Sequence, residues 1–515
     1  MTTTTSLIEP DDSFNRLLTA NVHPADWRNP TPDGRYNLVV VGAGTAGLIC
    51  ASVAAGLGAR VALVERHLMG GDCLNVGCVP SKGMIRAARV WASARDAAVF
   101  GLTFPGGVER DFGVAMERMR RLRSTISAVD SAERYRGLGV DVYLGDGQFT
   151  GPDALQVGDA TLHFARAAIC TGGRATAPPI PGLAEAGYLT NETIFSLTEL
   201  PPRLAVIGAG PIGCEMAQAF ARFGSDVTAF EQAGHILPRE DPDAAEVVQD
   251  RMTRDGVRFL FNTTVESVEP GPAGGRGEKR IRYTEGGETR DVTVDAILVS
   301  VGRAPNVENL GLEAAGVAFD RTGVTVDRYL HTTNPRIYAA GDICFPFKFT
   351  HTADAMAQIV IQNALFPHPF GLGRRTTDSL IIPWCTYTEP EIAHVGMYET
   401  DANAKDIAVE TFTQPLAEVD RAMLDGEDAG FARVLVERGS DRILGATIVA
   451  ADAGNLISEV TVAMQARAGL STIGAAIHPY PTQAEAWRKV ANQLRRARFS
   501  PRQKAFLTRL FTWSR

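Results

Sequence analysis

Two cysteines five positions apart have a spacing that could do chemistry. The segment from Gly70 to Lys82 reads GGDCLNVGCVPSK, with Cys73 and Cys78 at positions i and i+5. In a regular helix this spacing is a rise of about 7.5 Å, more than the roughly 7 Å between Cα atoms that a disulfide can bridge. A disulfide here therefore requires a break in the helix, which the neighbouring glycines allow. Such a bridge should be easily reduced.

A thiol pair in this setting is suited to redox chemistry. The apolar run after Lys82 predicts a helix whose N-terminus lies near the cysteines, and this favours the thiolate form. The alternative is two unrelated free thiols. The other five cysteines are scattered and the total of seven is odd, which is untypical of a secreted disulfide framework. None has zinc-site spacing, so we expect no metal site and a cytoplasmic protein.

The elements that position this pair include a repeated segment. Residues 37–65 and 203–231 are both 29 residues long and agree at 11 aligned positions. Each reads as an apolar strand, a GxGxxG turn, a helix of small residues and a second strand that ends in glutamate. The first copy contains Gly42, Gly44, Gly47 and Glu65, and the second contains Gly208, Gly210, Gly213 and Glu231.

This pattern is the dinucleotide-binding fingerprint in its strand–turn–helix context. Its glycines let the backbone approach a pyrophosphate at the start of a helix, and its glutamate can bind ribose hydroxyls. Ordinary glycine-rich turns would not explain why an acidic residue recurs at the same offset. The glycines also make the charge-free run 38–59 a strand, turn and helix rather than a membrane span. We therefore expect two different dinucleotides, as an electron relay requires.

Together with the cysteine segment and the two fingerprints, four further motifs resemble one family. They are CTGG at 170–173, GRAPN at 302–306, YAAGD at 338–342 and IHP at 477–479. Over roughly residues 36–495 the chain resembles the flavin disulfide reductases, which are the class I pyridine nucleotide-disulfide oxidoreductases. Within that family it looks closest to the mercuric reductases and the dihydrolipoamide dehydrogenases. The resemblance implies two Rossmann-like domains and a C-terminal α+β dimerisation domain.

The resemblance also implies the cofactor contacts. The first fingerprint would hold the ADP half of FAD, and the second would hold the nicotinamide cofactor. Lys82 would sit beside the flavin and pair with Glu215, and the helix after His351 would aim its N-terminus at the flavin. Further contacts to FAD would come from Gly71, Asp72, Gly147, Thr171, Gly172, Gly302 and Asp342.

The catalytic roles follow from the same resemblance. Cys78 would be the sulfur next to the flavin and form the charge-transfer thiolate, and Cys73 would be the interchange thiol that faces the substrate. His478 would be the base, supplied by the partner subunit of a homodimer; an isolated histidine could equally be a packing residue. Glu231 predicts NADH rather than NADPH, because a carboxylate repels a 2′-phosphate. The arginines typical of NADPH-specific members are absent from positions 232–235, which read QAGH.

The sequence departs from the family in three places. Disulfide-reducing members have a glutamate five residues after the histidine to orient it, but this position holds Gln483 and the next acid is Glu485. Mercuric reductases have a vicinal cysteine pair near the C-terminus, whereas no cysteine follows Cys385 here. Many of them also have an N-terminal metal-capture domain, which we do not expect here because Cys50 is the first cysteine. These departures leave the electron acceptor open between a disulfide and a thiophilic metal ion.

The expected domains follow the motifs along the chain. Residues 1–35 form an extension, with Trp27 packing on the body. Residues 36–190 and 301–375 form the FAD domain, and residues 191–300 form the nicotinamide domain, with a hairpin loop at 270–279. Residues 376–500 form the dimerisation domain, with antiparallel strands at 431–437 and 443–450. Residues 501–515 form a basic amphipathic segment with a short helix at 503–514.

Charge separates the main body from this last segment. The net charge is −8, which argues against nucleic acid as a partner. Residues 488–515 nevertheless carry nine Lys and Arg and no Asp or Glu. The helix at 503–514 either packs on its own domain, docks to a protein or contacts an anionic membrane through 502–514. The leading hypothesis is thus an NADH- and FAD-dependent reductase of a small-molecule acceptor, and the alternative is a flavoprotein redox sensor or membrane-associated electron-transfer module.

Overall fold

Both copies of the repeat form the strand–turn–helix–strand unit that the sequence predicts. The computed structural model describes residues 7–271 and 277–515. In the first copy, β1 (Arg35–Val41) leads through the glycine turn into α2 (Thr45–Gly56) and then β2 (Val61–Glu65). In the second copy, β8 (Arg203–Ile207), α8 (Pro211–Phe223) and β9 (Asp226–Phe230) follow the same order. The run 38–59 is therefore a strand and a helix, as expected.

The chain divides into two compact units, which are described separately. The first contains the chain up to Gly208, together with Ala219–Phe230 and Thr263–Leu380. The second contains Ala209–Gln218, Glu231–Asn262 and Ile381–Arg515.

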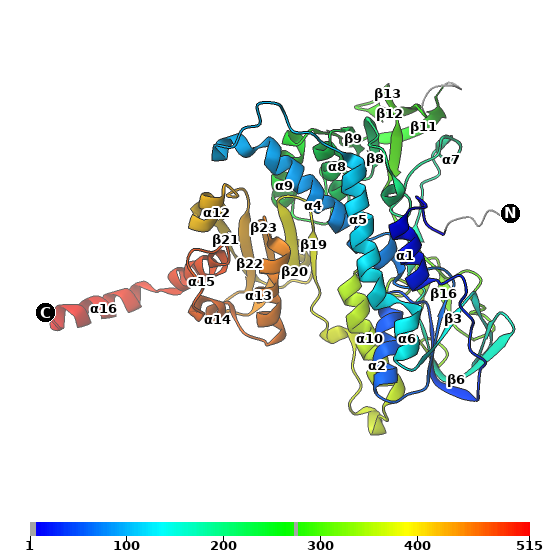
Figure 1. Cartoon of the computed structure of the whole chain (residues 1–515). Helices are drawn as coiled ribbons and strands as arrows, with labels where there is room; N and C mark the ends of the chain where they lie inside the picture. Colours follow the sequence, from blue (N-terminus) through cyan, green and yellow to red (C-terminus); the bar gives the residue numbers. More distant parts are fainter. Residues whose placement is uncertain (1–6, 272–276) are drawn as a thin grey trace. The chain divides into compact units, whose positions relative to one another are not determined.

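A mostly parallel sheet forms the centre of the first unit, in the order β3-β2-β1-β6-β5-β4, with β18 also paired to β6. Helices α2 and α10 pack together over its apolar face, and Figure 1 shows them side by side. This arrangement brings the glycine turn after β1 close to the start of α10. The further elements are β3 (Val140–Leu144), β4 (Gly147–Gly151), β5 (Ala154–Val157), β6 (Ala160–Ile169), β18 (Ile337–Ala339) and α10 (Thr350–Leu365).

Helices that surround the cysteine segment lie on the same unit. Helix α1 and helix α4 both pack against α5. The indole nitrogen of Trp27 donates to the carbonyl of Val142 at 3.2 Å, so this residue packs on the body as expected. The helices are α1 (Ser13–Val22), α3 (Gly71–Asn75), α4 (Cys78–Arg95), α5 (Phe112–Ser127) and α6 (Ala132–Gly137).

Three more groups of strands complete the first unit. Strands β9, β8 and β14 (Ala296–Val299) run parallel. An antiparallel sheet is formed by β11 (Thr264–Pro270), β12 (Lys279–Glu285) and β13 (Glu288–Val294). The hairpin loop expected at 270–279 has its centre, residues 272–276, outside the described residues. The shorter elements are β7 (Gly173–Ala175), α7 (Leu183–Ala186), β15 (Arg303–Pro305), β16 (Phe319–Asp320) and β17 (Gly323–Val324).

The second unit is built on a five-stranded antiparallel sheet in the order β19-β20-β23-β22-β21. Strands β22 (Phe431–Glu437) and β23 (Ile443–Ala450) have the bounds that the sequence predicts. Fully buried Trp487, on α15, lies in the core with the apolar face of the sheet. The other elements are α9 (Pro242–Arg254), β10 (Val257–Leu260), β19 (Pro383–Thr386), β20 (Glu391–Gly396), α11 (Glu399–Ala404), β21 (Val409–Pro415), α12 (Asp420–Asp425), α13 (Ala453–Gln465), α14 (Leu470–Ala475) and α15 (Glu485–Arg498).

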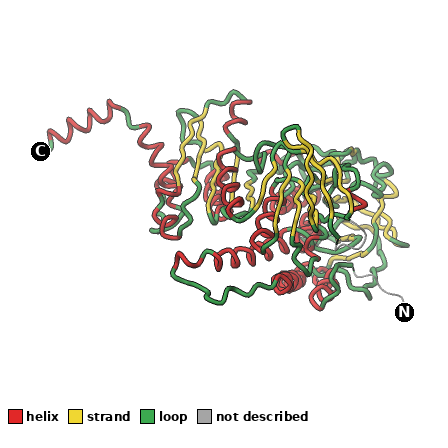
Figure 2. The backbone as a smooth tube through the Cα atoms, turned by 90° about the horizontal axis from the view of Figure 1, so that it is seen from above, coloured by secondary structure: helices red, strands yellow, loops and turns green. Residues whose placement is uncertain are grey.

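The basic segment forms the expected helix, α16 (Pro501–Trp513), which begins at a capping box between Ser500 and Gln503. No residue of α16 is buried. Both backbone views show the helix lying beyond α15 without a neighbour in its own unit (Figures 1 and 2). Of the three alternatives for its apolar face, packing on its own unit is therefore not seen in this chain, and the other two stay open. Among the helices described, none is long and apolar enough to cross a membrane.

Candidate active site

The cysteine segment contains the helix break that a 73–78 bridge requires. Cys73 lies in the five-residue helix α3, and Cys78 is the first residue of α4. Val76 and Gly77 lie between the two helices, and Gly77 has a φ of −132° and a ψ of −115°. A Cβ at this position would lie 2.7 Å from the carbonyl oxygen of Asp72, so a side chain there would force the segment apart. The break therefore confirms the local geometry that the spacing demands.

Both sulfurs are free thiols in the structure, with Cys73 partly buried and Cys78 exposed. The Sγ of Cys78 lies 3.4 Å from the hydroxyl of Thr350, the first residue of α10. The hydrogen bond to Cys78, followed by burial, raises the pKa of the Cys73 thiol well above its usual range. Cys78, the first residue of α4 and a neighbour of the first residue of α10, lies at the positive ends of two helix dipoles. The expected helix near His351 begins one residue earlier, at Thr350.

A buried arginine, Arg123, contacts the backbone of the cysteine segment. Arg123, on α5, is 1% exposed. One terminal nitrogen donates to the carbonyl of Asn75 at 2.6 Å, and the other donates to the side-chain oxygen of Asn15 at 2.7 Å. Burial lowers the pKa of the guanidinium to about 10. These contacts connect α1 to the end of α3, and no sequence motif indicated them.

Lys82 and Glu215 belong to different units. The Nζ of Lys82 lies 3.4 Å from the hydroxyl of Ser81 in the first unit. The buried carboxylate of Glu215 accepts the backbone N–H of Tyr387 at 2.9 Å in the second unit. Their expected pairing therefore stays a prediction.

The first glycine turn has the features of a pyrophosphate cradle. Gly42 has a φ of +100°, and a Cβ there would lie 2.5 Å from the carbonyl oxygen of Cys170. A Cβ on Gly47 would overlap the carbonyl oxygen of Gly42, so the helix start lies directly against the turn. Gly71 approaches so closely that its Cβ would lie 2.7 Å from the Cα of Gly44. The exposed N–H groups at the start of α2 can therefore meet a diphosphate.

The two fingerprint glutamates make matching contacts. Glu65 accepts the N–H of Ala43 at 2.7 Å and that of His67 at 2.8 Å, one on each carboxylate oxygen. In the second copy, the N–H of Ala209 and of Ala233 donate to the two oxygens of Glu231, at 2.7 and 2.9 Å. Each oxygen keeps a further lone pair, which a ribose hydroxyl could use.

A charged cluster lies beside the first glycine turn. Arg303 contacts the carboxylate of Asp72, and its Nε lies 3.6 Å from the carboxylate of Asp342. Burial raises the pKa of Asp342. The Nε of Arg303 is buried without a hydrogen-bond partner among the residues described. Such incompletely satisfied polar groups suit a hydroxyl-rich ligand such as the ribityl and phosphate part of FAD.

The remaining expected FAD contacts lie on the same unit. The hydroxyl of Thr171 donates to the carbonyl of Asn306 at 2.9 Å, and the Asn306 amide donates back to the carbonyl of Thr171 at 2.8 Å. Gly172 and Gly302 both have φ values that favour glycine, +66° and +80°. Gly147 packs on β2, where a Cβ would lie 3.1 Å from Val64. The residues present therefore fit FAD.

His478 lies between α14 and α15, with a side chain only 6% exposed. Its Nε2 lies 2.9 Å from the carboxylate of Glu459 on α13, and its Nδ1 lies 3.2 Å from the carbonyl oxygen of Ala476. Gln483 instead donates to Glu427 at 2.9 Å, and the buried Glu485 contacts Arg488. The carboxylate that orients His478 is thus Glu459, 19 residues before it, which sequence spacing did not indicate.

Comparison with known proteins places these sites in a family. Residues 36–358 match the model of the pyridine nucleotide-disulphide oxidoreductases, and residues 382–491 match the dimerisation domain of that family. Among curated relatives, mercuric reductase of Staphylococcus aureus is 35% identical over 458 residues, covering 88% of this chain and 81% of the relative. Dihydrolipoyl dehydrogenase of Chlamydia muridarum is 32% identical over 466 residues, covering 88% of this chain and 96% of the relative.

Solved structures agree with this assignment. The Cu(II) complex of the HOCl-induced flavoprotein disulfide reductase RclA from Escherichia coli superposes with a TM-score of 0.77 at 29% identity, covering 90% of this chain and all of that chain. LpdA from Mycobacterium tuberculosis superposes with a TM-score of 0.78 at 26% identity, covering 89% of this chain and 99% of that chain. The family uses FAD and a pyridine nucleotide, and both glycine turns here are built for dinucleotides. The chain therefore belongs to the pyridine nucleotide-disulphide oxidoreductases, a family of dimeric flavoprotein oxidoreductases.

Proposed function

We propose that this protein passes electrons from NADH through FAD to a Cys73–Cys78 disulfide, and from the resulting dithiol to a small disulfide or a thiophilic metal ion. The observation that carries this proposal is the helix break between the two cysteines. It places Cys78 at the start of α4 and 3.4 Å from the first residue of α10. The alternative, two unrelated thiols, does not account for a glycine whose side chain would separate them.

Cys73 and Cys78 have different roles in the proposed reaction. Bound FAD supplies the two-electron connection between a nicotinamide and a disulfide. Reduction of the disulfide takes two electrons and two protons and produces two thiols. The positive ends of α4 and α10 favour the thiolate at Cys78, and Cys73 donates its proton toward that sulfur. Cys73 is then the thiol that attacks the acceptor once its proton is removed.

His478 is proposed as the base that removes this proton, provided by the partner subunit as in the family. Glu459 holds Nε2, so the second ring nitrogen is the one available for proton transfer. Its contact with the Ala476 carbonyl is longer, at 3.2 Å, and must open first. The role of His478 thus depends on a carboxylate on α13.

The cofactor assignment follows the two glutamates. Residues 36–190 and 301–375 are proposed to bind FAD, through the first glycine turn, Glu65, and the cluster around Asp342. Residues 191–300 are proposed to bind NADH through Gly208, Gly210, Gly213 and Glu231. The Glu231 carboxylate accepts two backbone N–H groups in an orientation that would place a 2′-phosphate next to a negative charge. NADPH should therefore bind less well.

Two features bear on the acceptor. The similar mercuric reductases and the Cu(II) complex of RclA favour a thiophilic metal ion, whereas the dihydrolipoyl dehydrogenases favour a disulfide. The described residues contain no group of three or more His, Cys, Asp or Glu that could hold a metal ion, so a metal would be reduced in passing rather than stored.

Steady-state NADH oxidation tests the proposal. Lipoamide, glutathione disulfide, Hg(II), Cu(II) and a quinone would be compared with oxygen alone, using Cys73→Ser as the matched control. We expect multiple turnovers with at least one disulfide or metal ion and their loss in the variant. Turnover confined to oxygen or quinones and unaffected by Cys73→Ser would refute the proposal. A single turnover per flavin with every acceptor would instead identify a redox sensor.

A further inference from the structure

Helix α16 presents an apolar face that nothing in its own unit covers. Four large apolar side chains lie on it with high exposure: Phe506 at 67%, Leu510 at 42%, Phe511 at 56% and Trp513 at 86%. At about 100° per residue, these four and Leu507 occupy an arc of about 160° on the helix. The other face carries Ala505, Thr508 and Thr512. The helix is therefore amphipathic and unpartnered.

Basic residues border this arc on both sides. By the same rotation, Arg502 and Arg509 lie along one edge, and Lys504 lies along the other. Arg515 follows the end of the helix. Long basic side chains at the edges of an apolar face can extend to anionic groups while their stems cover the apolar residues. The arrangement is that of a helix lying flat in a lipid headgroup layer.

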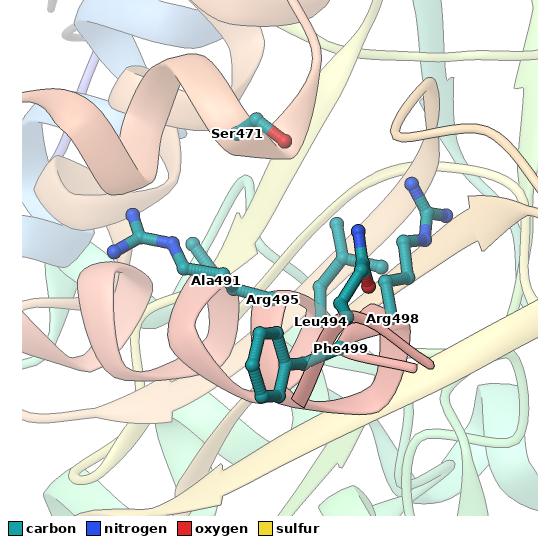
Figure 3. A pocket seen from close by; sticks show the side chains of 7 residues that line it. Ser471, Ala491, Leu494, Arg495, Arg498 and Phe499 are labelled. Atoms are coloured by element: carbon teal, nitrogen blue, oxygen red, sulfur yellow. The ribbon is translucent and has the colours of Figure 1, made fainter. Parts of the chain in front are cut away.

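A basic groove opens at the base of the helix. It has a volume of about 280 Å³ and lies between α14, α15 and the start of α16. Figure 3 shows the side chain of Ser471 on one side of it, and Arg495 and Arg498 on α15. Arg498 donates to the carbonyl of Ser440 and lies 3.3 Å from the carboxylate of Glu410. The complete lining is Ser471, Ala491, Leu494, Arg495, Arg498, Phe499 and Gln503.

The positive charge of α16 favours an anionic bilayer over a second copy of this helix as the partner of its apolar face. Residues 488–515 carry nine Lys and Arg and no Asp or Glu, although the whole chain has a net charge of −8. A second α16 packed on the first would bring like charges together, which disfavours a second copy of this helix. An anionic bilayer offers both the apolar layer for the aromatic face and the negative charges for its edges.

We propose that α16 and the groove at its base bind an anionic phospholipid surface. The aromatic face lies in the boundary between headgroups and acyl chains, and Arg495 receives a headgroup phosphate at the mouth of the groove. The interaction is peripheral, because α16 has only 13 residues. It holds the reductase at the membrane independently of which acceptor it reduces.

Co-sedimentation of the holoenzyme with vesicles tests this proposal. Vesicles of phosphatidylcholine alone would be compared with vesicles containing about one third phosphatidylglycerol, each at low and high salt. We expect the enzyme to sediment with the anionic vesicles at low salt and to be released at high salt. Trp513 should show a blue-shifted emission on binding, identified by subtracting the spectrum of Trp513→Phe.

Matched variants separate this surface from other positive charges. Phe506→Ser with Phe511→Ser should weaken vesicle binding at least tenfold, whereas Thr508→Ala with Thr512→Ala on the opposite face should leave it unchanged. Arg495→Gln should weaken binding about fivefold, and Arg442→Gln, which removes an exposed charge on another part of the unit, should not. Because α16 has no buried residue, these changes should not alter the thermal midpoint.

Several outcomes would overturn the proposal. The enzyme could remain in the supernatant with anionic vesicles at low salt, or bind both vesicle types equally. The aromatic double variant could bind as tightly as the unchanged enzyme. Finally, size-exclusion chromatography could show an oligomer that disappears on truncation after residue 500, which would identify a second copy as the occupant of this face.

Discussion

Glu65 and Glu231 occupy equivalent positions 166 residues apart and accept equivalent pairs of backbone hydrogen bonds. In each copy, one carboxylate oxygen accepts the N–H of the alanine inside the glycine turn at 2.7 Å. The other oxygen accepts the N–H of the residue two positions after the glutamate. The carboxylate therefore fixes the shape of the turn as well as offering lone pairs to a ligand. A change of charge at either residue should affect one cofactor and leave the other unaffected.

Glu231→Gln should lower kcat/KM for NADH by about 10- to 30-fold, because hydrogen bonds to a charged group are lost. It should also reduce the preference for NADH over NADPH, because the repulsion of the 2′-phosphate is removed. The matched control is Glu65→Gln, which should weaken FAD retention while leaving the KM for NADH unchanged. Equal efficiency with NADPH and NADH in the unchanged enzyme would contradict the assignment.

The two sulfurs should behave unequally. Anaerobic titration with NADH should take up two electrons before free reduced flavin appears, with a long-wavelength charge-transfer absorption. Cys78→Ser should abolish that band, because Cys78 is the sulfur beside Thr350 at the start of α10. Cys73→Ser should keep the band and lose disulfide reduction. Normal disulfide reduction by Cys73→Ser would show that the roles are wrongly assigned.

His478 and Glu459 of one subunit should act together on the cysteine pair of the other subunit. His478→Gln should lower turnover with a disulfide about 100-fold, and Glu459→Gln about tenfold, because general-base catalysis contributes on this scale. NADH-dependent flavin reduction should be unaffected in both. Gln483→Ala, which breaks the contact to Glu427, is the matched control and should have little effect.

Subunit mixing then tests where the base comes from. A heterodimer of one Cys73→Ser subunit and one His478→Gln subunit should recover activity, because it keeps one complete site. Full activity in a verified monomer would exclude a shared site.

Arg123 should hold the cysteine segment in place. Arg123→Met leaves the carbonyl of Asn75 and the side-chain oxygen of Asn15 without their charged donor, which should cost about 3 kcal/mol of unfolding free energy. Arg121→Met, an exposed change on the same helix, should be near neutral. The reduction potential of the cysteine pair should shift only in Arg123→Met. An unchanged potential would limit Arg123 to a purely structural role.

His394 should make the second unit sensitive to acid. This fully buried ring lies 2.7 Å from the hydroxyl of Thr447 and stacks on Tyr398. Burial lowers its pKa from 6.5 to about 4. The unfolded chain therefore binds a proton before the folded protein does. The stabilisation is complete above about pH 6.5 and is lost as the pH falls toward 4, by about 3 kcal/mol in total.

The matched experiment compares thermal midpoints at pH 7 and pH 4.5 in the unchanged protein and in His394→Gln. The variant should lose less stability on acidification. Glu240, whose pKa is raised by burial, contributes with the opposite sign and is present in both proteins, so their difference isolates the histidine. An identical pH dependence in both would contradict the assignment.

Local patterns made much of this structure predictable. The repeat predicted the turns at Gly42 and Gly208, because only backbone without a side chain fits there, and strands β22 and β23 have the bounds that were predicted. Contacts between distant segments left no such pattern. Glu459 is 19 residues from His478, and Asn15 is 108 residues from Arg123. What covers the apolar face of α16 was likewise left open, because an amphipathic sequence shows that one face is apolar without showing what binds it.

The break between α3 and α4 would couple the redox state of the two cysteines to the freedom of the backbone around them. A disulfide between Cys73 and Cys78, as proposed above, would link the short helix α3 to the first residue of α4 across the two residues between the helices, Val76 and Gly77. Reduction would remove that link, while the contact from Arg123 to the carbonyl of Asn75 would remain. If the proposed disulfide forms, the two electrons that convert it to a dithiol would therefore also release the backbone that carries Cys73, so that redox state and local backbone freedom would change together.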